Sequence, residues 1–462
     1  MFTSSYNRRS RPFHIAALFT FVLLVTSHIG AQNVLDGASK GTEELYAKMV
    51  EEAESHRKAK RLEQAKAIFT EITQLWPERP VGHFGRGISN MELGKRDEAI
   101  VDFEKALKLK PGDIDLHLLL GVNQFHLDRC DDAVPNLSKA IEALPSTTDP
   151  SFFRGLCFAR AERFQDALTD FDRVLSFKPG VAQVHFFRGT IKQELGRLEE
   201  ALADLNSAIE LDQRYAEWFV VRGYLNLDLG RPEPAFLDMT RAIELEPANP
   251  RLYRARSLAA EELDNLGVAT RDVKKALELD PKYSDAQIAL SYLYFRLEDN
   301  QGLIAASERS IAIDPSEPMT YNNRAYAMIL EGKLGEAKKD LAKALELDPQ
   351  HTFSLNNTAL IAYLEGDLEK ALKGVERVIE LDPELPEAYL NRGYVLRKQG
   401  KVKEAITDFT KAISLRPWLR RAFDARADAY QELGEREKAE SDRQSSKELF
   451  EKIQEWRRQA AR

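Results

Sequence analysis

Small and apolar residues recur along most of the chain with a period of 34 residues, and no insertion or deletion interrupts the period. The repeats begin at residues 46, 80, 114, 148, 182, 216, 250, 284, 318, 352, 386 and 420. Repeat position 8 is always Gly, Ala or Ser, position 20 is Ala except for Leu303, and position 32 is Pro except for Gln213 and Glu451. A fixed period of this length is typical of arrays in which each unit packs on its neighbours.

The pattern predicts two antiparallel helices in each repeat. Two helices cross closely only where side chains lack bulk, so we expect the small residue at position 8 to face Ala at position 20. Proline at position 32 ends the second helix, because it has no N–H to continue the hydrogen-bond ladder. Glycine at position 15 is expected to end the first helix with a left-handed C-cap. Seven repeats have it: Gly94, Gly196, Gly230, Gly332, Gly366, Gly400 and Gly434.

Two charged positions occur together. Arg occupies position 7 in eight repeats (residues 86, 154, 188, 222, 256, 324, 392 and 426), and Asp occupies position 23 in the same eight (residues 102, 170, 204, 238, 272, 340, 408 and 442). The other four repeats lack both. Positions that vary together are expected to touch, so each Arg is predicted to pair with the Asp of its own second helix. These pairs are interpreted as scaffold.

The pattern resembles the tetratricopeptide repeat family, and the segment FGRGISNMELGKRDEAIVDFEKALKLKP (84–111) is a close match to one unit. The resemblance covers residues 46–453 and implies an all-α, right-handed superhelical solenoid of twelve repeats; it is specific for fold and says little about function. Repeat 8 departs from it at Leu303, Ser307 and Ser310, and Pro135 lies inside a second helix. Local looseness or a kink is expected at both places.

The chain begins differently. Arg8, Arg9 and Arg11 precede an apolar run, Ile15 to Val25, and short residues follow up to Ala31. This is the layout of a secretory signal peptide. The run has about half of the ~20 residues that a membrane helix needs, so cleavage after Ala31 is favoured over an uncleaved anchor. We therefore expect a secreted or periplasmic protein with no membrane insertion after cleavage. The predicted organisation is signal peptide (1–31), polar lead and start of the first helix (32–45), repeats (46–453) and C-terminal helix extension (454–462).

Composition narrows the range of partners and chemistry. The net charge is −8, and it becomes −11 without residues 1–31, so nucleic acid is an unlikely partner. The repeats leave no room for a catalytic domain. The His residues lack metal-binding spacing, no phosphate-binding loop is present, and no enzyme activity, metal or cofactor is expected. Cys130 and Cys157 lie in adjacent repeats, where contact is plausible and an oxidising compartment would favour a bridge.

The family resemblance implies where a partner would bind. In such repeats, positions 2, 5, 6, 9, 12 and 13 of the first helices line the concave groove. Five amides occupy positions 5 and 6 of repeats 9 to 11: Asn322, Asn323, Asn356, Asn357 and Asn391. Amides match the donors and acceptors of a peptide backbone, as in the asparagine ladder of the glycosyltransferases that modify intracellular proteins. Aromatic residues of the kind enriched at interfaces lie near them: Tyr292, Phe295, Tyr326, Tyr363 and Tyr394.

Other interpretations stay open at this stage. The amides would be structural if each bonds a neighbouring helix. Position 5 of repeats 2 to 6 is apolar, which fits either packing between first helices or an apolar peptide groove: Phe84, Leu118, Phe152, Phe186 and Val220. No repeat has the Lys residues of a terminal-carboxylate clamp. We expect an exported scaffold or adaptor that binds extended protein segments; the alternatives are a structural or oligomer-assembly protein and an accessory subunit of a cell-envelope enzyme.

Overall fold

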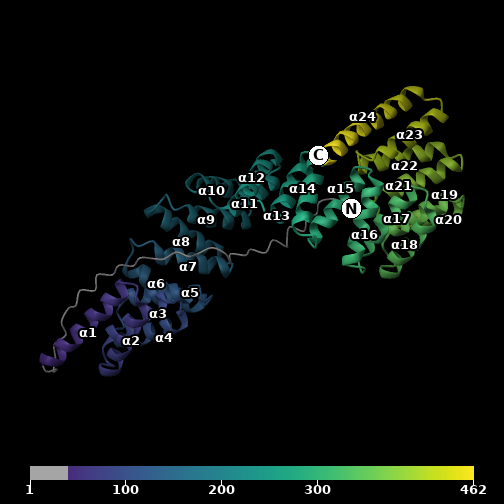
Figure 1. Cartoon of the computed structure of the whole chain (residues 1–462). Helices are drawn as coiled ribbons and strands as arrows, with labels where there is room; N and C mark the ends of the chain where they lie inside the picture. The colour runs from purple at the N-terminus through teal and green to yellow at the C-terminus, as the bar shows by residue number, and fades with distance from the viewer. Residues whose placement is uncertain (1–39, 462) are drawn as a thin grey trace. The chain divides into compact units, whose positions relative to one another are not determined.

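The computed structural model of the chain describes residues 40–461, so the predicted signal peptide lies outside the described residues. Within them the chain is all-α, with 24 helices arranged as twelve consecutive pairs (Figure 1). The described residues divide into two compact units, 40–214 and 215–461, which we call the N-terminal unit and the C-terminal unit.

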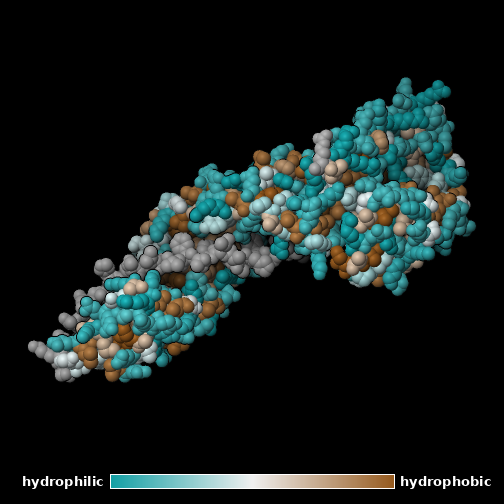
Figure 2. Space-filling model, in the orientation of Figure 1, coloured by the Kyte–Doolittle hydropathy of each residue, from teal (hydrophilic) through white to brown (hydrophobic). Residues whose placement is uncertain are grey.

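The N-terminal unit contains repeats 1 to 5. Its helices are α1 (Lys40–Lys58), α2 (Leu62–Leu75), α3 (Pro80–Glu92), α4 (Arg96–Leu109), α5 (Ile114–His126), α6 (Cys130–Ala143), α7 (Asp149–Arg160), α8 (Phe164–Phe177), α9 (Ala182–Glu194) and α10 (Leu198–Leu211). Helix α6 runs on past Pro135, and a kink there stays a prediction. Each pair packs on the next, and the face drawn in Figure 2 is largely hydrophilic with scattered hydrophobic residues.

The C-terminal unit contains repeats 6 to 12. Its helices are α11 (Ala216–Asp228), α12 (Pro232–Leu245), α13 (Pro250–Glu262), α14 (Leu266–Leu279), α15 (Ser284–Arg296), α16 (Asn300–Ile313), α17 (Pro318–Leu330), α18 (Leu334–Leu347), α19 (Thr352–Leu364), α20 (Leu368–Leu381), α21 (Pro386–Lys398), α22 (Val402–Leu415), α23 (Arg420–Glu432) and α24 (Arg436–Ala461). Helix α24 has 26 residues, where the second helices of the other repeats have 14. The residues 454–461 are therefore a direct continuation of the last second helix.

The first helices end as the sequence predicts, and the same turn also occurs in the repeats that lack glycine. All seven glycines at repeat position 15 have φ between 68° and 88°. The five repeats without glycine adopt the same left-handed conformation, with φ between 51° and 61° at Lys60, Asp128, Glu162, Asp264 and Glu298. A side chain is disfavoured at positive φ, so the packing of the two helices imposes this turn even where the residue resists it.

The close crossing within each repeat involves a second residue besides the expected Ala at position 20. A Cβ atom added to Gly87 would lie 2.5 Å from the Phe103 ring, and one added to Gly155 would lie 2.8 Å from Phe171. Both rings are at repeat position 24 and are fully buried. Ala at position 20 contributes mainly its main-chain oxygen, which would lie 3.1 Å from a Cβ on Gly189. Small residues at 8 and 20 bring the helices together, and the large side chain at 24 fills the space beside them.

All eight predicted Arg–Asp pairs are present, with closest N–O distances between 2.5 and 2.8 Å. Most are two-pronged, as for Arg154, which donates through Nε and Nη2 to the two carboxylate oxygens of Asp170. The Asp side chains are buried, so each guanidinium compensates a charge removed from water.

The same arginines make a contact that was not expected. The Nη1 atom of Arg154 donates to Ser138 at 2.9 Å, and that of Arg188 donates to Asp172 at 2.7 Å. Both acceptors lie at repeat position 25 of the preceding repeat; Thr240 and Thr410 play the same part for Arg256 and Arg426. The guanidinium therefore joins the two helices of its own repeat and also the repeat before it.

Arg154→Met should destabilise repeat 4 by about 3 kcal/mol, because it leaves the buried Asp170 carboxylate without its cation. Hydrogen exchange of α7 and α8 should show this locally, since a repeat array opens in parts. The double variant Arg154→Met/Asp170→Leu should recover most of the loss. Burial already raises the pKa of Asp170. A carboxyl with a raised folded-state pKa destabilises the fold as pH rises through that pKa, so the deficit of Arg154→Met should shrink on acidification. A pH-independent deficit, or no recovery in the double variant, would contradict this account.

Candidate functional site

First helices lie side by side on the inner side of the C-terminal unit. Helix α17 contacts α19, and α19 contacts α21 in turn. The side chains that the family resemblance assigns to the groove of repeats 8 to 11 therefore project from neighbouring helices onto one surface. We call this surface, from α15 to α21, the inner face.

Four of the five candidate amides are buried between these helices. Their side chains are at most 5% exposed: Asn322, Asn356, Asn357 and Asn391. The Asn357 amide donates to the Asn322 oxygen at 2.8 Å, and the Asn391 amide donates to the Asn356 oxygen at 3.0 Å. In repeats 10 and 11, position 6 thus donates to position 5 of the repeat before it. These amides bond neighbouring first helices to each other, which favours the structural interpretation, while Asn323 is only half-buried.

The candidate aromatic residues form a row along the inner face. The rings of Phe295 and Tyr326 have centroids 5.4 Å apart, and those of Tyr363 and Tyr394 are stacked at 5.8 Å. Burial raises the pKa of Tyr394, so its hydroxyl stays protonated and available as a hydrogen-bonding group at neutral pH. Tyr292 lies at the end of this row, where its hydroxyl accepts from Arg296 at 3.1 Å.

The turn between repeats 11 and 12 lies on this aromatic row. We call residues 416–421 the plug segment. The Trp418 ring lies 6.1 Å from the Phe295 ring, edge to face, and the Arg296 guanidinium stacks 4.2 Å from the Trp418 centroid. Arg421 Nη1 donates to the Tyr326 hydroxyl at 3.0 Å. A turn of the chain itself, followed by the first residues of α23, therefore occupies the surface that the sequence assigned to a peptide.

Little space remains under the plug segment. A cavity of about 10 Å³ is lined by Tyr326, three of the asparagines, Leu419 and Arg421, among others. This volume is about that needed for one water molecule. Arg416 at the start of the segment is buried and paired with Glu387, and burial lowers its pKa to about 10. At neutral pH Arg416 is still charged.

Two sequence signals for this contact were present but not used. Trp418 is at repeat position 33, where the other repeats have Gly, Ala, Ser, Glu, Gln, Lys or Arg. Arg416 is at position 31, which is Asp or Glu in repeats 5 to 10. Trp418 replaces the small or polar residues found at position 33, and Arg416 replaces the acidic residues found at position 31 of those repeats. Both side chains lie on the inner face rather than in solvent.

In the N-terminal unit the apolar residues at position 5 rest on the cores of their own repeats. The Phe84 ring lies 6.3 Å from Phe103, and the Phe152 ring lies 6.3 Å from Phe171. Phe84, Leu118 and Phe152 are half-buried, whereas Phe186 is buried. In the C-terminal unit, Val220 is half-buried. Packing within the repeats therefore accounts for much of each side chain.

Two arginines lie near His126 in the N-terminal unit. Arg96 donates to Asn123 at 3.0 Å, and Arg160 pairs with Asp128 at 2.8 Å. Burial lowers the pKa of His126 to about 4, and Arg96 and Arg160 add to the effect. The imidazole is therefore neutral at physiological pH and packs as a ring against Phe125 and Phe153.

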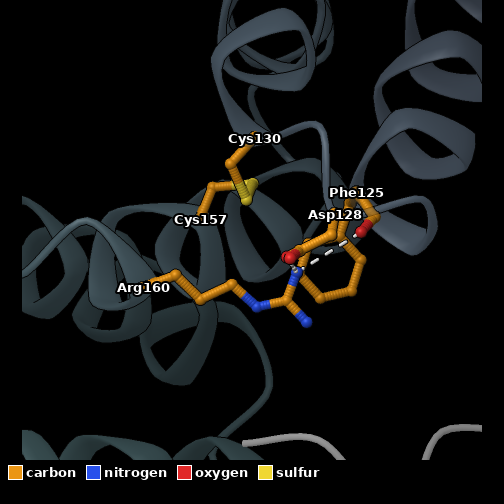
Figure 3. The surroundings of a disulfide bond; sticks show 5 residues. All are labelled: Phe125, Asp128, Cys130, Cys157 and Arg160. Carbon is orange, nitrogen blue, oxygen red and sulfur yellow. Dashed lines mark hydrogen bonds and ion pairs between the residues drawn. A yellow bond between two sulfur atoms is a disulfide. The ribbon is translucent and has the colours of Figure 1, made fainter.

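Cys130 and Cys157 are bonded to each other (Figure 3). Their Cα atoms are 5.2 Å apart, within the usual range for a disulfide. The bond ties the start of α6 to α7, and Arg160 beside it donates to Asp128 and to the Phe125 carbonyl. It fastens repeat 3 to repeat 4 at the repeat whose second helix contains Pro135.

Within the described part of the chain, no three His, Cys, Asp or Glu side chains are grouped so that they could hold a metal ion. In the same residues no helix combines the length and apolar character needed to cross a membrane. The groups capable of binding are thus aromatic rings, amides and arginines.

Replacing Asn391 by Ala should lower the free energy of unfolding of repeats 10 and 11 by about 1 to 3 kcal/mol, because the Asn356 oxygen is left buried without a donor. The matched control is Asn323→Ala at the same repeat position, where the half-buried side chain predicts a change within about 0.5 kcal/mol. Thermal melting combined with hydrogen exchange of α19 and α21 would measure both. Equal effects of the two substitutions would contradict a structural role for the buried pair.

Family models described as tetratricopeptide repeat or TPR repeat match residues 80–113, 118–182, 182–215, 320–351, 359–400 and 386–418. No curated protein matches the chain.

Several solved structures are similar to it. A MamA protein is 20% identical with a TM-score of 0.35, over 37% of this chain and 93% of that one. The Cut9–Hcn1 hetero-tetramer of the APC/C is 12% identical with a TM-score of 0.42, over 89% and 95%. The C-terminal part of a TPR repeat-containing protein from Cytophaga hutchinsonii is 17% identical with a TM-score of 0.48, over 52% and 98%. The twelve helical pairs and the matching family models show that the chain belongs to the tetratricopeptide repeat family.

Proposed function

We propose that this protein is an exported, non-catalytic adaptor that binds extended protein segments along the first-helix face of its repeats. Membership of the tetratricopeptide repeat family supports a protein-interaction scaffold in general. The observation that carries the finer proposal is the plug segment, because Trp418 and Arg421 lie against Phe295 and Tyr326 as a bound peptide would. The inner face therefore has the chemistry to hold polypeptide.

Two observations support export. Residues 1–31 have the layout of a secretory signal. The Cys130–Cys157 bond is of a kind that persists in oxidising compartments and is rare in the cytosol. The two together support the proposed secreted or periplasmic location.

The charges support a scaffold rather than an enzyme. The eight buried aspartates at repeat position 23 are engaged in the Arg–Asp pairs that hold the two helices together. They are occupied by structural partners, so they offer no free carboxylate pair for acid–base chemistry. The proposed role therefore rests on surface recognition.

Export predicts the N-terminus of the native protein. When the full chain is produced in its natural host, N-terminal sequencing of the purified protein should begin near Gln32, and residues 1–35 should carry a reporter across the cytoplasmic membrane. Arg8, Arg9 and Arg11 replaced together by Glu should retain the reporter inside, because the positive n-region is lost. An intact N-terminus on native protein would contradict the proposal.

Groove binding predicts where a partner touches the N-terminal unit. A photo-reactive amino acid at Ile88, on first helix α3, should give covalent adducts with a partner in the cell-envelope fraction. The same group at Val101, on second helix α4 of the same repeat, should give none, although Val101 is 51% exposed. Adducts from Val101 alone would contradict groove binding and support the assembly alternative, in which the second-helix surface makes the contact.

A further inference from the structure

The end of the chain is fastened to a repeat far from it in sequence. Ile453, Trp456 and Ala460 of α24 share one buried cluster with Leu266 and Val273 of α14. Figure 1 shows α24 running back toward α14, and the two helices are in direct contact. We call residues 452–461 the latch. The latch belongs to the last helix, yet it packs on repeat 7.

Polar contacts add to this packing. Arg457 Nε donates to the Leu297 carbonyl at 2.8 Å, and its Nη2 donates to the Glu298 carbonyl. These carbonyls lie in the turn that ends α15. Lys274 donates to the Ala460 carbonyl at 3.2 Å, and Lys452 pairs with Asp264. The latch therefore bonds to the turns and second helix of repeats 7 and 8.

Gly267 makes room for the latch. A Cβ atom there would lie 2.7 Å from the Trp456 carbonyl oxygen and would also overlap Gln459. Repeat position 18 is Glu, Asp, Gln or Lys in every repeat except repeats 7 and 9, which have Gly267 and Gly335. At Gly335 an added Cβ would meet nothing within 4 Å. Of these two glycines, Gly267 lies against the latch and Gly335 does not.

The turn that ends α15, which bonds to the latch, also holds the plug segment. Arg420 pairs with Glu298 at 3.0 Å, and Glu298 is the residue whose carbonyl accepts from Arg457 of the latch. Trp418 lies between Phe295 and Arg296, and Arg421 reaches Tyr326. The plug segment and the latch therefore meet at the turn after α15, and the plug segment lies on the inner face.

We propose that the inner face of repeats 8 to 11 is a binding site for an extended protein segment that carries arginine next to an aromatic residue, and that the plug segment and latch close this site in the free protein. This inference rests on the proposed function and names its partner by chemistry. The partner displaces the plug segment and opens the latch.

The groups that face the plug segment define that chemistry. Glu298 supplies a carboxylate for a guanidinium, and the Tyr326 hydroxyl supplies a further acceptor. Phe295 and Arg296 supply the two sides of a slot for an aromatic ring. A segment that presents arginine and an aromatic ring at neighbouring positions satisfies all of them, as Trp418, Arg420 and Arg421 do.

The test opens the latch without touching the inner face. Gly267→Gln places at position 18 a residue that Gln165 and Gln301 show is compatible with the repeat, but it collides with α24. Gly335→Gln is the matched control. The probe is a fluorescent peptide with the sequence of residues 414–423, SLRPWLRRAF, added to the full chain. We expect it to bind Gly267→Gln at least about tenfold more tightly than the wild type or Gly335→Gln, because closure lowers the competent fraction.

Hydrogen exchange makes the outcome decisive. In Gly267→Gln, residues 416–421 and 452–461 should exchange faster while α17 to α21 stay protected. A peptide with Ala in place of the Trp and the last two Arg should not bind. If the segments exchange as in the wild type, closure by the latch is wrong. If they open and the probe still does not bind, the partner chemistry is wrong. If the variant instead forms dimers in light scattering, a second copy is the occupant and the proposal is overturned.

A charge reversal provides an independent variant if Gly267→Gln does not fold. Arg420→Glu should increase probe binding by placing two acids together, whereas Arg420→Lys, which keeps the positive charge opposite Glu298, should bind the probe like the wild type. Equal probe binding by the two variants would count against the pair. These results are separate from the crosslinking at Ile88, which concerns the N-terminal unit, so groove binding in general and the closed site can fail independently.

Discussion

The close approach of the two helices in each repeat is the contact on which the remaining structure depends. At Gly87, Gly155 and Gly223 the neighbouring helix leaves no room for a Cβ atom, and the large side chain at position 24 fills the space. This separation is what lets an arginine on the first helix reach an aspartate on the second with two hydrogen bonds. The third arm of the same guanidinium then reaches the preceding repeat, so the spacing within one repeat also sets the stacking of the next.

The sequence allowed most of the repeat to be predicted because these constraints recur. A feature that appears twelve times at one spacing can be separated from chance, which is how the caps and the Arg–Asp pairs were found. The contact of position 8 with the side chain at position 24 was not assigned, because periodicity shows that a position is small without showing which atoms press on it. The bond from Arg154 to Ser138 was missed since position 25 holds many residue types across the repeats, and no single one marks it.

The contacts that close the C-terminal unit could not be predicted from the repeat pattern, for a different reason. Trp418 and Phe295 are separated by more than a hundred residues, and no periodic pattern connects them. Only departures from the repeat point to such a contact, and Trp418 and Gly267 are departures of that kind. The asparagines were difficult to interpret because their side chains fit two kinds of partner. Their donors match a peptide backbone, but the same donors match the neighbouring helix, and Asn357 and Asn391 are bonded there. Amide chemistry alone does not decide between the two partners.

The plug segment belongs to the same chain as the inner face, so a separate partner must compete with its high effective concentration. A tethered segment presents itself at an effective concentration in the millimolar range for a short flexible link, and higher still when it is fixed on a folded repeat. A partner at micromolar concentration therefore has to bind about a thousandfold more tightly than the plug segment, about 4 kcal/mol, to compete without help. Weakening the latch lowers this requirement directly, since residues 452–461 hold the plug segment in place through the turn after α15. Because each repeat packs chiefly on its neighbours, the latch can detach while repeats 8 to 11 stay folded. The latch packs on α14 and on the turn after α15, and this position is what allows opening to be separated from unfolding.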